Sequence, residues 1–125
     1  MNLDAIGIVS HDIKKSVTFY KILGLALEQK GGPDHFEATT PSGVRIMLDT
    51  VALVKQLNPK WEKPTGCGVV LCFKQKTPAQ VDKLYENFME GKFTSVKEPW
   101  DAFWGQRYAS VSDPDGNQID LFADL

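Results

Sequence analysis

The sequence predicts an α+β fold of two similar units, each with the order strand, helix and three strands. In each half of the 125-residue chain, an apolar segment leads into a capped amphipathic helix, and the half ends in two strand-like segments joined by a turn with Pro and Gly. A continuous alternation of strands and helices would instead predict a parallel sheet without terminal hairpins. We place the first unit at about residues 1–50, the linker at about 51–65 and the second unit at about 66–125.

The first half begins with an apolar strand, Leu3–Val9, which ends at polar residues suited to start a helix. Apolar residues then recur at three- and four-residue spacings, and Gly24 follows where a left-handed C-cap is expected. We therefore predict a helix over Asp12–Leu23. The turn of the terminal hairpin contains Pro41 and Gly43. The other strands predicted in this half are Ala26–Lys30, His35–Thr39 and Val44–Asp49.

The second half repeats this order. An apolar strand is predicted over Gly68–Lys74, and the next helix has Thr77 as its N-cap, Pro78 at its first position and Gly91 at its end. In the linker, Val51–Leu57 is a candidate for a short extra helix. The strands predicted after the second helix are Phe93–Glu98, Gln106–Val111 and Asn117–Phe122.

Composition and charge exclude several classes of protein. The net charge is -2 and the basic residues are scattered, so the basic stripe of a nucleic-acid-binding protein is missing. No apolar stretch approaches the roughly 20 residues of a membrane helix, and the N-terminus does not resemble a signal peptide. We therefore expect a cytoplasmic protein, with neither a membrane nor a nucleic acid as partner. Cys67 and Cys72 lie in or beside one apolar run and are expected to be buried thiols.

Several short motifs follow one another in a specific order. They are Gly7-Ile8-Val9-Ser10, Phe19-Tyr20, Leu23-Gly24-Leu25, Trp104-Gly105 and Asp113-Pro114-Asp115-Gly116-Asn117-Gln118-Ile119-Asp120-Leu121. From Leu3 to Phe122 the chain resembles the vicinal oxygen chelate superfamily, which includes glyoxalase I, extradiol dioxygenases, fosfomycin-resistance enzymes and bleomycin-resistance proteins. It is most similar to the metal-free bleomycin-resistance-like branch. The resemblance implies curved mixed sheets with their helices on the convex face, two units forming a cup around a ligand, and a homodimer.

Strand periodicity divides the apolar strands between two faces. One set is expected to pack on the helices: Ile6, Ile8, Ile46, Leu48, Val69, Leu71, Ile119 and Leu121. The alternate set is expected to face the cup: Ala5, Gly7, Arg45, Met47, Gly68, Val70, Cys72, Gln118, Asp120 and Phe122.

The resemblance also indicates where metal ligands would lie. In metal-using relatives the ligands occupy positions that correspond to Ala5, Met47, Gly68 and Asp120, and only Asp120 is a donor for a hard cation. We therefore expect no metal, no cofactor and no catalytic residues inherited from the family. A relocated metal site that uses the side chains listed next stays an alternative: His35, Glu37, Asp49 and Asp120.

Aromatic residues in polar segments are candidate walls of a ligand site, because loops run over the surface. These residues are Trp61, Trp100, Phe103 and Trp104, and the alternative for each tryptophan is a packing role. Asp120 is expected either to pair with Arg45 or Arg107 or to face the ligand. Arg45 is expected either to pair with Asp120 or to bind an anionic ligand. The other candidate ligand-binding residues are His35, Met47, Arg107 and Phe122.

The favoured hypothesis is a protein that sequesters a bulky, partly aromatic compound such as an antibiotic, without chemistry, because loss of the metal ligands removes the Lewis acid of the family's reactions. One alternative is an enzyme: a metal-dependent lyase, isomerase or dioxygenase with relocated ligands, or a metal-free catalyst that uses Asp120 or a tyrosine. Another is an interaction module whose cup is filled by its own side chains.

Overall fold

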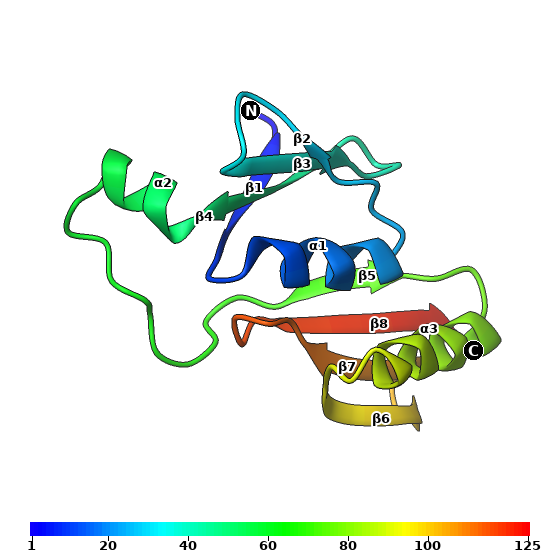
Figure 1. Ribbon diagram of the computed structural model, residues 1–125. Helices are drawn as coiled ribbons and strands as arrows, with labels where there is room; N and C mark the ends of the chain where they lie inside the picture. The colour runs from blue at the N-terminus through cyan, green and yellow to red at the C-terminus, as the bar shows by residue number, and fades with distance from the viewer. The chain divides into compact units, whose positions relative to one another are not determined.

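The computed structural model describes all 125 residues and divides into two compact units, Met1–Pro64 and Thr65–Leu125 (Figure 1). The elements of the first unit are β1 (Ala5–Ser10), α1 (Ile13–Ile22), β2 (Glu28–Gln29), β3 (His35–Thr39), β4 (Arg45–Thr50) and α2 (Val51–Leu57). Those of the second are β5 (Leu71–Lys74), α3 (Pro78–Glu90), β6 (Thr94–Ala102), β7 (Gln106–Ser112) and β8 (Gln118–Asp124). Each unit contains the predicted order of strand, helix and three strands, so the α+β fold class is confirmed.

Each unit has one four-stranded sheet of the same topology. The strand orders are β1-β4-β3-β2 and β5-β8-β7-β6, with the first and last strands of each unit parallel and the other pairs antiparallel. In the first unit α1 packs against β4, and in the second α3 packs against β6, β7 and β8. None of the helices is long and apolar enough to cross a membrane.

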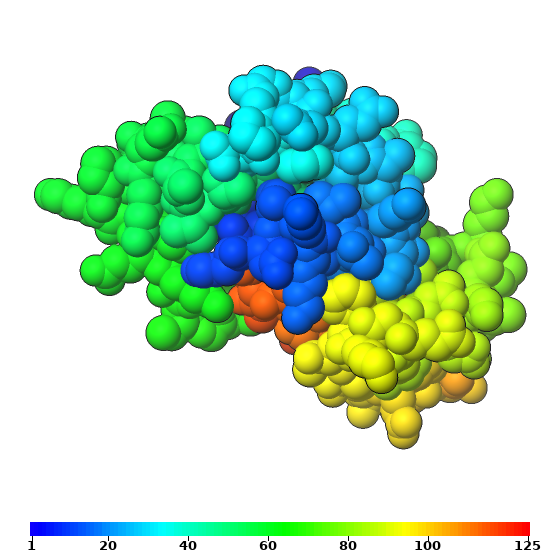
Figure 2. Space-filling view, viewed as in Figure 1, coloured from blue at the N-terminus to red at the C-terminus, as the bar shows by residue number.

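The cores lie between each sheet and its helix. In the first unit Ile8, Ile46 and Leu48 are buried with Phe19 and Tyr20 of α1. The second unit buries Val81 and Phe88 of α3, together with Val111, Ile119 and Leu121 of the sheet. These strand residues have the parity predicted for the helix-facing set, because alternate strand residues point to opposite faces. The outer side of α1 is polar, and this helix lies at the surface of its unit (Figure 2).

Side-chain caps fix where the helices begin. Asp12 accepts a hydrogen bond from the Lys15 backbone N–H at 3.1 Å, and Thr77 accepts one from the Gln80 N–H at 3.2 Å. Each cap satisfies a donor that the first helical turn leaves free. The short helix α2, suggested by the sequence, is present over the expected residues, with Thr50 as its N-cap.

Three local predictions are wrong. Strand β5 starts at Leu71 instead of Gly68, so Val69 is 72% exposed and does not pack on the helix. Strand β2 covers two residues only. Cys67 and Cys72 are both exposed, because one precedes β5 and the other points away from α3.

Strand β6 is longer than predicted. It continues past Glu98 through Pro99 and Trp100 to Ala102, and its pairing with β7 shifts register twice. Proline is tolerated in an edge strand, and bulges accommodate such shifts. Trp100 is therefore a strand residue and does not lie in a loop, whereas Trp104 lies in the tight turn between β6 and β7.

Candidate functional site

The face of the second sheet opposite α3, with the adjoining β6–β7 turn, carries the predicted ligand-binding residues Trp100, Phe103, Trp104, Asp120 and Phe122. Cys72 lies beside Asp120 in register, Ser110 lies beside Asp120 on its other side, and Tyr108 lies between Phe122 and Trp100. Cross-strand partners share a face of the sheet, and the intervening Ile119 and Leu121 are buried toward α3. The register therefore gathers aromatic and polar side chains on this one face.

Four rings form a continuous row, which we call the aromatic row: Trp100, Trp104, Tyr108 and Phe122. The centroid distances are 5.6 Å from Trp100 to Trp104, 5.3 Å from Trp104 to Tyr108 and 5.9 Å from Tyr108 to Phe122. The first two contacts are edge-to-face, and the third is stacked at an interplanar angle of 22°. Trp104 is 49% exposed and Phe103, which contacts it, is 90% exposed, so these rings present apolar surface for binding.

A chain of polar contacts orients the turn that carries Trp104. The Trp104 indole N–H donates to Gln106 Oε1 at 2.8 Å, and Gln106 Nε2 donates to Asp124 Oδ1 at 3.1 Å. Lys74 Nζ lies 2.8 Å from the other oxygen of Asp124 and lowers the pKa of that carboxyl. Gly105 has φ of 90°, a conformation that residues with a Cβ rarely adopt, so the turn itself depends on this glycine.

Asp120 is buried at the edge of the row and is held by neutral donors only. Its Oδ2 accepts a hydrogen bond from the Tyr108 hydroxyl at 2.7 Å, and its Oδ1 accepts from Ser110 Oγ at 2.7 Å and Gln118 Nε2 at 2.9 Å. The pKa of Tyr108 is raised well above its ordinary value, first by desolvation and then by its bond to Asp120. Tyr108 therefore stays protonated and donates across the physiological pH range. Its oxygen also lies 3.7 Å from Cys72 Sγ.

The predicted pairing of Asp120 with an arginine is wrong. Arg107 donates to Asp82 of α3 at 2.9 and 3.3 Å and to Asp101 at 3.1 Å, so it lies on the helix side of the sheet. Arg45 belongs to the first unit and donates to Asp4 there. Parity explains the error for Arg107, because odd-numbered and even-numbered residues of β7 point to opposite faces.

In the first unit, the face opposite α1 carries an ionic cluster around His35. His35 Nδ1 lies 2.5 Å from Asp49 Oδ1, and Nε2 lies 2.9 Å from Glu37 Oε2. These contacts raise the pKa of His35 above 6.5, the Glu37 bond contributing most. The pKa of Glu37 is lowered from 4.5 to about 2, first by His35 and then by Lys30. Arg45 Nη1 also reaches Glu37, at 3.1 Å.

The positions inherited from metal-using relatives do not fit a metal. In the strand register Met47 pairs with Gly7 in the first unit, and Asp120 pairs with Cys72 in the second, so Gly7 and Cys72 are equivalent. The residue equivalent to Ala5, two positions earlier, is therefore Val70. The position predicted from the resemblance, Gly68, precedes the strand, because the linker reaches β5 later than expected. Alanine, methionine and valine offer no donor for a hard cation, so Asp120 would be the single protein ligand at these positions.

The residues of the alternative, relocated site are arranged as ion pairs. His35, Glu37 and Asp49 are neighbours, and each ring nitrogen of His35 is engaged by one of the two carboxylates. No group of three or more His, Cys, Asp or Glu side chains is arranged to hold a metal ion.

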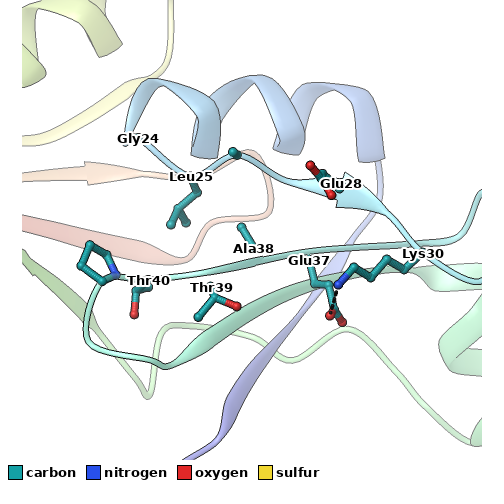
Figure 3. A pocket seen from close by; sticks show the side chains of 10 residues that line it. Gly24, Leu25, Glu28, Lys30, Glu37, Ala38, Thr39 and Thr40 are labelled. Carbon is teal, nitrogen blue, oxygen red and sulfur yellow. Dashed lines mark hydrogen bonds and ion pairs between the residues drawn. The ribbon is translucent and has the colours of Figure 1, made fainter.

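The first unit has two further features, a half-buried tryptophan and a surface hollow. Trp61 is half-buried, and its ring lies 6.2 Å from that of His11. A hollow of about 460 Å³ lies between the chain that follows α1 and the end of β3 (Figure 3). Lys30 and Glu37, both in its lining, are joined at 3.2 Å, and Glu28 is a further charged residue of the lining.

The sequence prediction missed Tyr108 and Ser110 as partners of Asp120. Both lie on the strand that was correctly predicted before the last turn, and their even numbers give them the parity of the face opposite α3. Extending the alternation from β8 to its hairpin partner would have found them, because hairpin register follows from the turn.

Comparison with known proteins gives the family. The model described as Glyoxalase/Bleomycin resistance protein/Dioxygenase superfamily matches residues 2–121. The fold is similar to that of a glyoxalase/bleomycin resistance protein/dioxygenase family enzyme from Burkholderia phytofirmans PsJN, with a TM-score of 0.88, 20% identity and coverage of 100% of both chains. No curated protein matches the sequence.

Two other solved structures are similar. A glyoxalase/bleomycin resistance protein/dioxygenase from Nocardioides has a TM-score of 0.78 and 26% identity, and the match covers 100% of this chain and 84% of the Nocardioides chain. A glyoxalase/dioxygenase from Nostoc punctiforme has a TM-score of 0.75 and 22% identity, and the match covers 99% of this chain and 91% of the Nostoc chain. Since the family model spans nearly the whole sequence, the chain belongs to the Glyoxalase/Bleomycin resistance protein/Dioxygenase superfamily.

Proposed function

We propose that this protein binds a bulky, partly aromatic small molecule, such as an antibiotic, and sequesters it without chemical change. The observation that carries the proposal is the aromatic row with its half-exposed Trp104. Rings at edge-to-face and stacked distances favour a further ring by the same quadrupole interactions and by burial of apolar area. A planar compound would meet several ring surfaces on the second sheet and its β6–β7 turn.

The polar groups beside the row support binding over catalysis. Asp120 is the one carboxylate at an inherited ligand position, and it is committed to Tyr108, Ser110 and Gln118. A general base must reach the proton that it removes, whereas Asp120 is buried and three of its roughly four acceptor positions are occupied. The raised pKa of Tyr108 likewise makes its hydroxyl a poor base near neutral pH. These groups hold the shape of the site and do not supply reactivity.

Fluorescence titration with a panel of planar aromatic compounds tests the proposal. A bound ring should quench tryptophan emission, and Trp104→Ala should weaken binding by about 1–3 kcal/mol, as expected for an aromatic anchor. Trp104→Phe keeps a ring and should retain most of the affinity. Trp61→Ala, in the first unit, tests whether the other tryptophan predicted to bind the ligand contributes to the affinity. Urea unfolding of each variant separates lost binding from lost folding.

The same mixtures distinguish sequestration from catalysis. After long incubation at protein excess, chromatography should recover the bound compound unchanged. Full affinity in Trp104→Ala for every binding compound would refute the role of the row, and steady conversion of a compound would refute the absence of chemistry.

We also propose that the protein forms a homodimer. β1 and β5 are edge strands of their sheets, and such edges are commonly covered by a second chain. Sedimentation at micromolar concentration should give a mass near twice 13.9 kDa. A monomer that still binds the aromatic probe would show that one chain supplies the complete site.

A further inference from the structure

The indole N–H of Trp100 is the buried polar side-chain group that the protein leaves without a partner. Its nitrogen is covered from solvent and makes no hydrogen bond. The other donors of the aromatic row are satisfied, Trp104 by Gln106 and Tyr108 by Asp120. Because buried donors in proteins are nearly always paired, an unpaired one within a ligand surface indicates a contact that another molecule completes.

The neighbours of the Trp100 ring are side chains that can move. Trp104 contacts it edge-on at 5.6 Å, is half-exposed and lies in the turn between β6 and β7. Lys97 Nζ lies 4.6 Å from the ring centroid and belongs to an exposed residue of the bulged edge strand. A rotation of Trp104 breaks its exposed hydrogen bond to Gln106, which water can replace, and a rotation of either side chain leaves the helix-facing core unchanged.

Resting on the function proposed above, we propose that the ligand is a planar aromatic molecule with a hydrogen-bond acceptor at its edge, and that Trp100 donates to this acceptor when Trp104 moves aside. Tryptophan is a donor only, so the complementary ligand atom is a ring nitrogen or a carbonyl oxygen. A ring without an acceptor would leave the N–H unpaired in the complex. The site therefore selects among rings of equal size by the atom at their edge.

Isoquinoline and naphthalene form a matched pair of probes, since they share shape and area and differ by one ring nitrogen. At about pH 8 the isoquinoline nitrogen is unprotonated and accepts a hydrogen bond. We expect the wild-type protein to bind isoquinoline about 3- to 10-fold more tightly than naphthalene, the range of one net hydrogen bond. Trp100→Phe keeps a ring but removes the N–H, so it should bring the ratio of the two affinities to about 1, whatever its effect on the affinity for naphthalene itself.

The indole resonances give a direct readout. The Trp100 cross-peak in a ¹H–¹⁵N spectrum is identified by its loss in Trp100→Phe, and it should move downfield with isoquinoline and not with naphthalene. If Trp100→Phe does not fold, the preference is measured in the wild-type protein alone. Trp104→Phe and Trp61→Phe then identify the other two indole resonances, and the remaining one belongs to Trp100.

The outcomes separate the two proposals. Equal binding of both probes, or a preference that survives in Trp100→Phe, refutes the proposed hydrogen bond from Trp100 but not the proposed aromatic site. A preference without movement of the Trp100 resonance also refutes this hydrogen bond. Binding of neither probe overturns the acceptor together with the proposed aromatic site.

Discussion

The two sheets have the same topology but hold charge in opposite ways. On the face opposite α1, His35 lies between Glu37 and Asp49, and opposite charges compensate one another in contact with solvent. On the face opposite α3, Asp120 is buried and is compensated by neutral donors alone. A repeated backbone thus fixes where side chains point, whereas their chemistry decides how the face responds to pH and to the loss of a partner.

Removal of the buried carboxylate should have the largest effect. Asp120→Ala leaves the donors of Tyr108, Ser110 and Gln118 without their acceptor, so we expect a loss of about 2–4 kcal/mol in the free energy of unfolding. Urea unfolding at neutral pH measures it. Asp120→Asn keeps one acceptor oxygen and should lose less. A wild-type stability in Asp120→Ala would show that the carboxylate is strained and not satisfied by its donors.

The ionic cluster should respond to pH. The raised pKa of His35 means that its contribution is present below pH 6.5 and is lost as pH rises through the folded-state value. The lowered pKa of Glu37 means that its contribution is present above pH 4.5 and is lost as pH falls toward about 2. The cluster therefore stabilises the protein most between these limits.

His35→Gln tests this window by urea unfolding across pH. The stability difference from wild type should be greatest between pH 4.5 and 6.5 and should shrink above the folded-state pKa of His35. In the His11→Gln background only one histidine remains, so its NMR titration reports His35 directly. A stability difference that is constant with pH would contradict the assigned pairing.

Added divalent metal should have the smallest effect on either face. The inherited positions lack donors, and the nitrogens of His35 are engaged, so Zn²⁺, Ni²⁺, Mn²⁺ or Fe²⁺ should leave the melting temperature unchanged. Elemental analysis of the purified protein provides the second measurement. About one metal per chain, lost together with stability on chelation, would contradict this and favour the enzymatic alternative.

The sequence by itself determined the repeated order of elements and the face of most core residues. Helix caps at Asp12 and Thr77 and the periodicity of Ile8, Ile119 and Leu121 are local signals, and local signals suffice for element type and parity. The position of Asp120 on the face opposite α3 follows from the same alternation. The family also followed from the order of short motifs along the chain.

Only the tertiary structure decided the contacts at the far edge of the second sheet. Arg107 and Tyr108 lie on the same strand beside β8, so alternation alone separates them, whereas the extension of β6 to Ala102 depends on its pairing with β7. The same pairing brings Trp100 beside Tyr108 and leaves its N–H without an acceptor. Such contacts join residues distant in the chain, so no local propensity specifies them; they are fixed by strand register and by the burial that register creates.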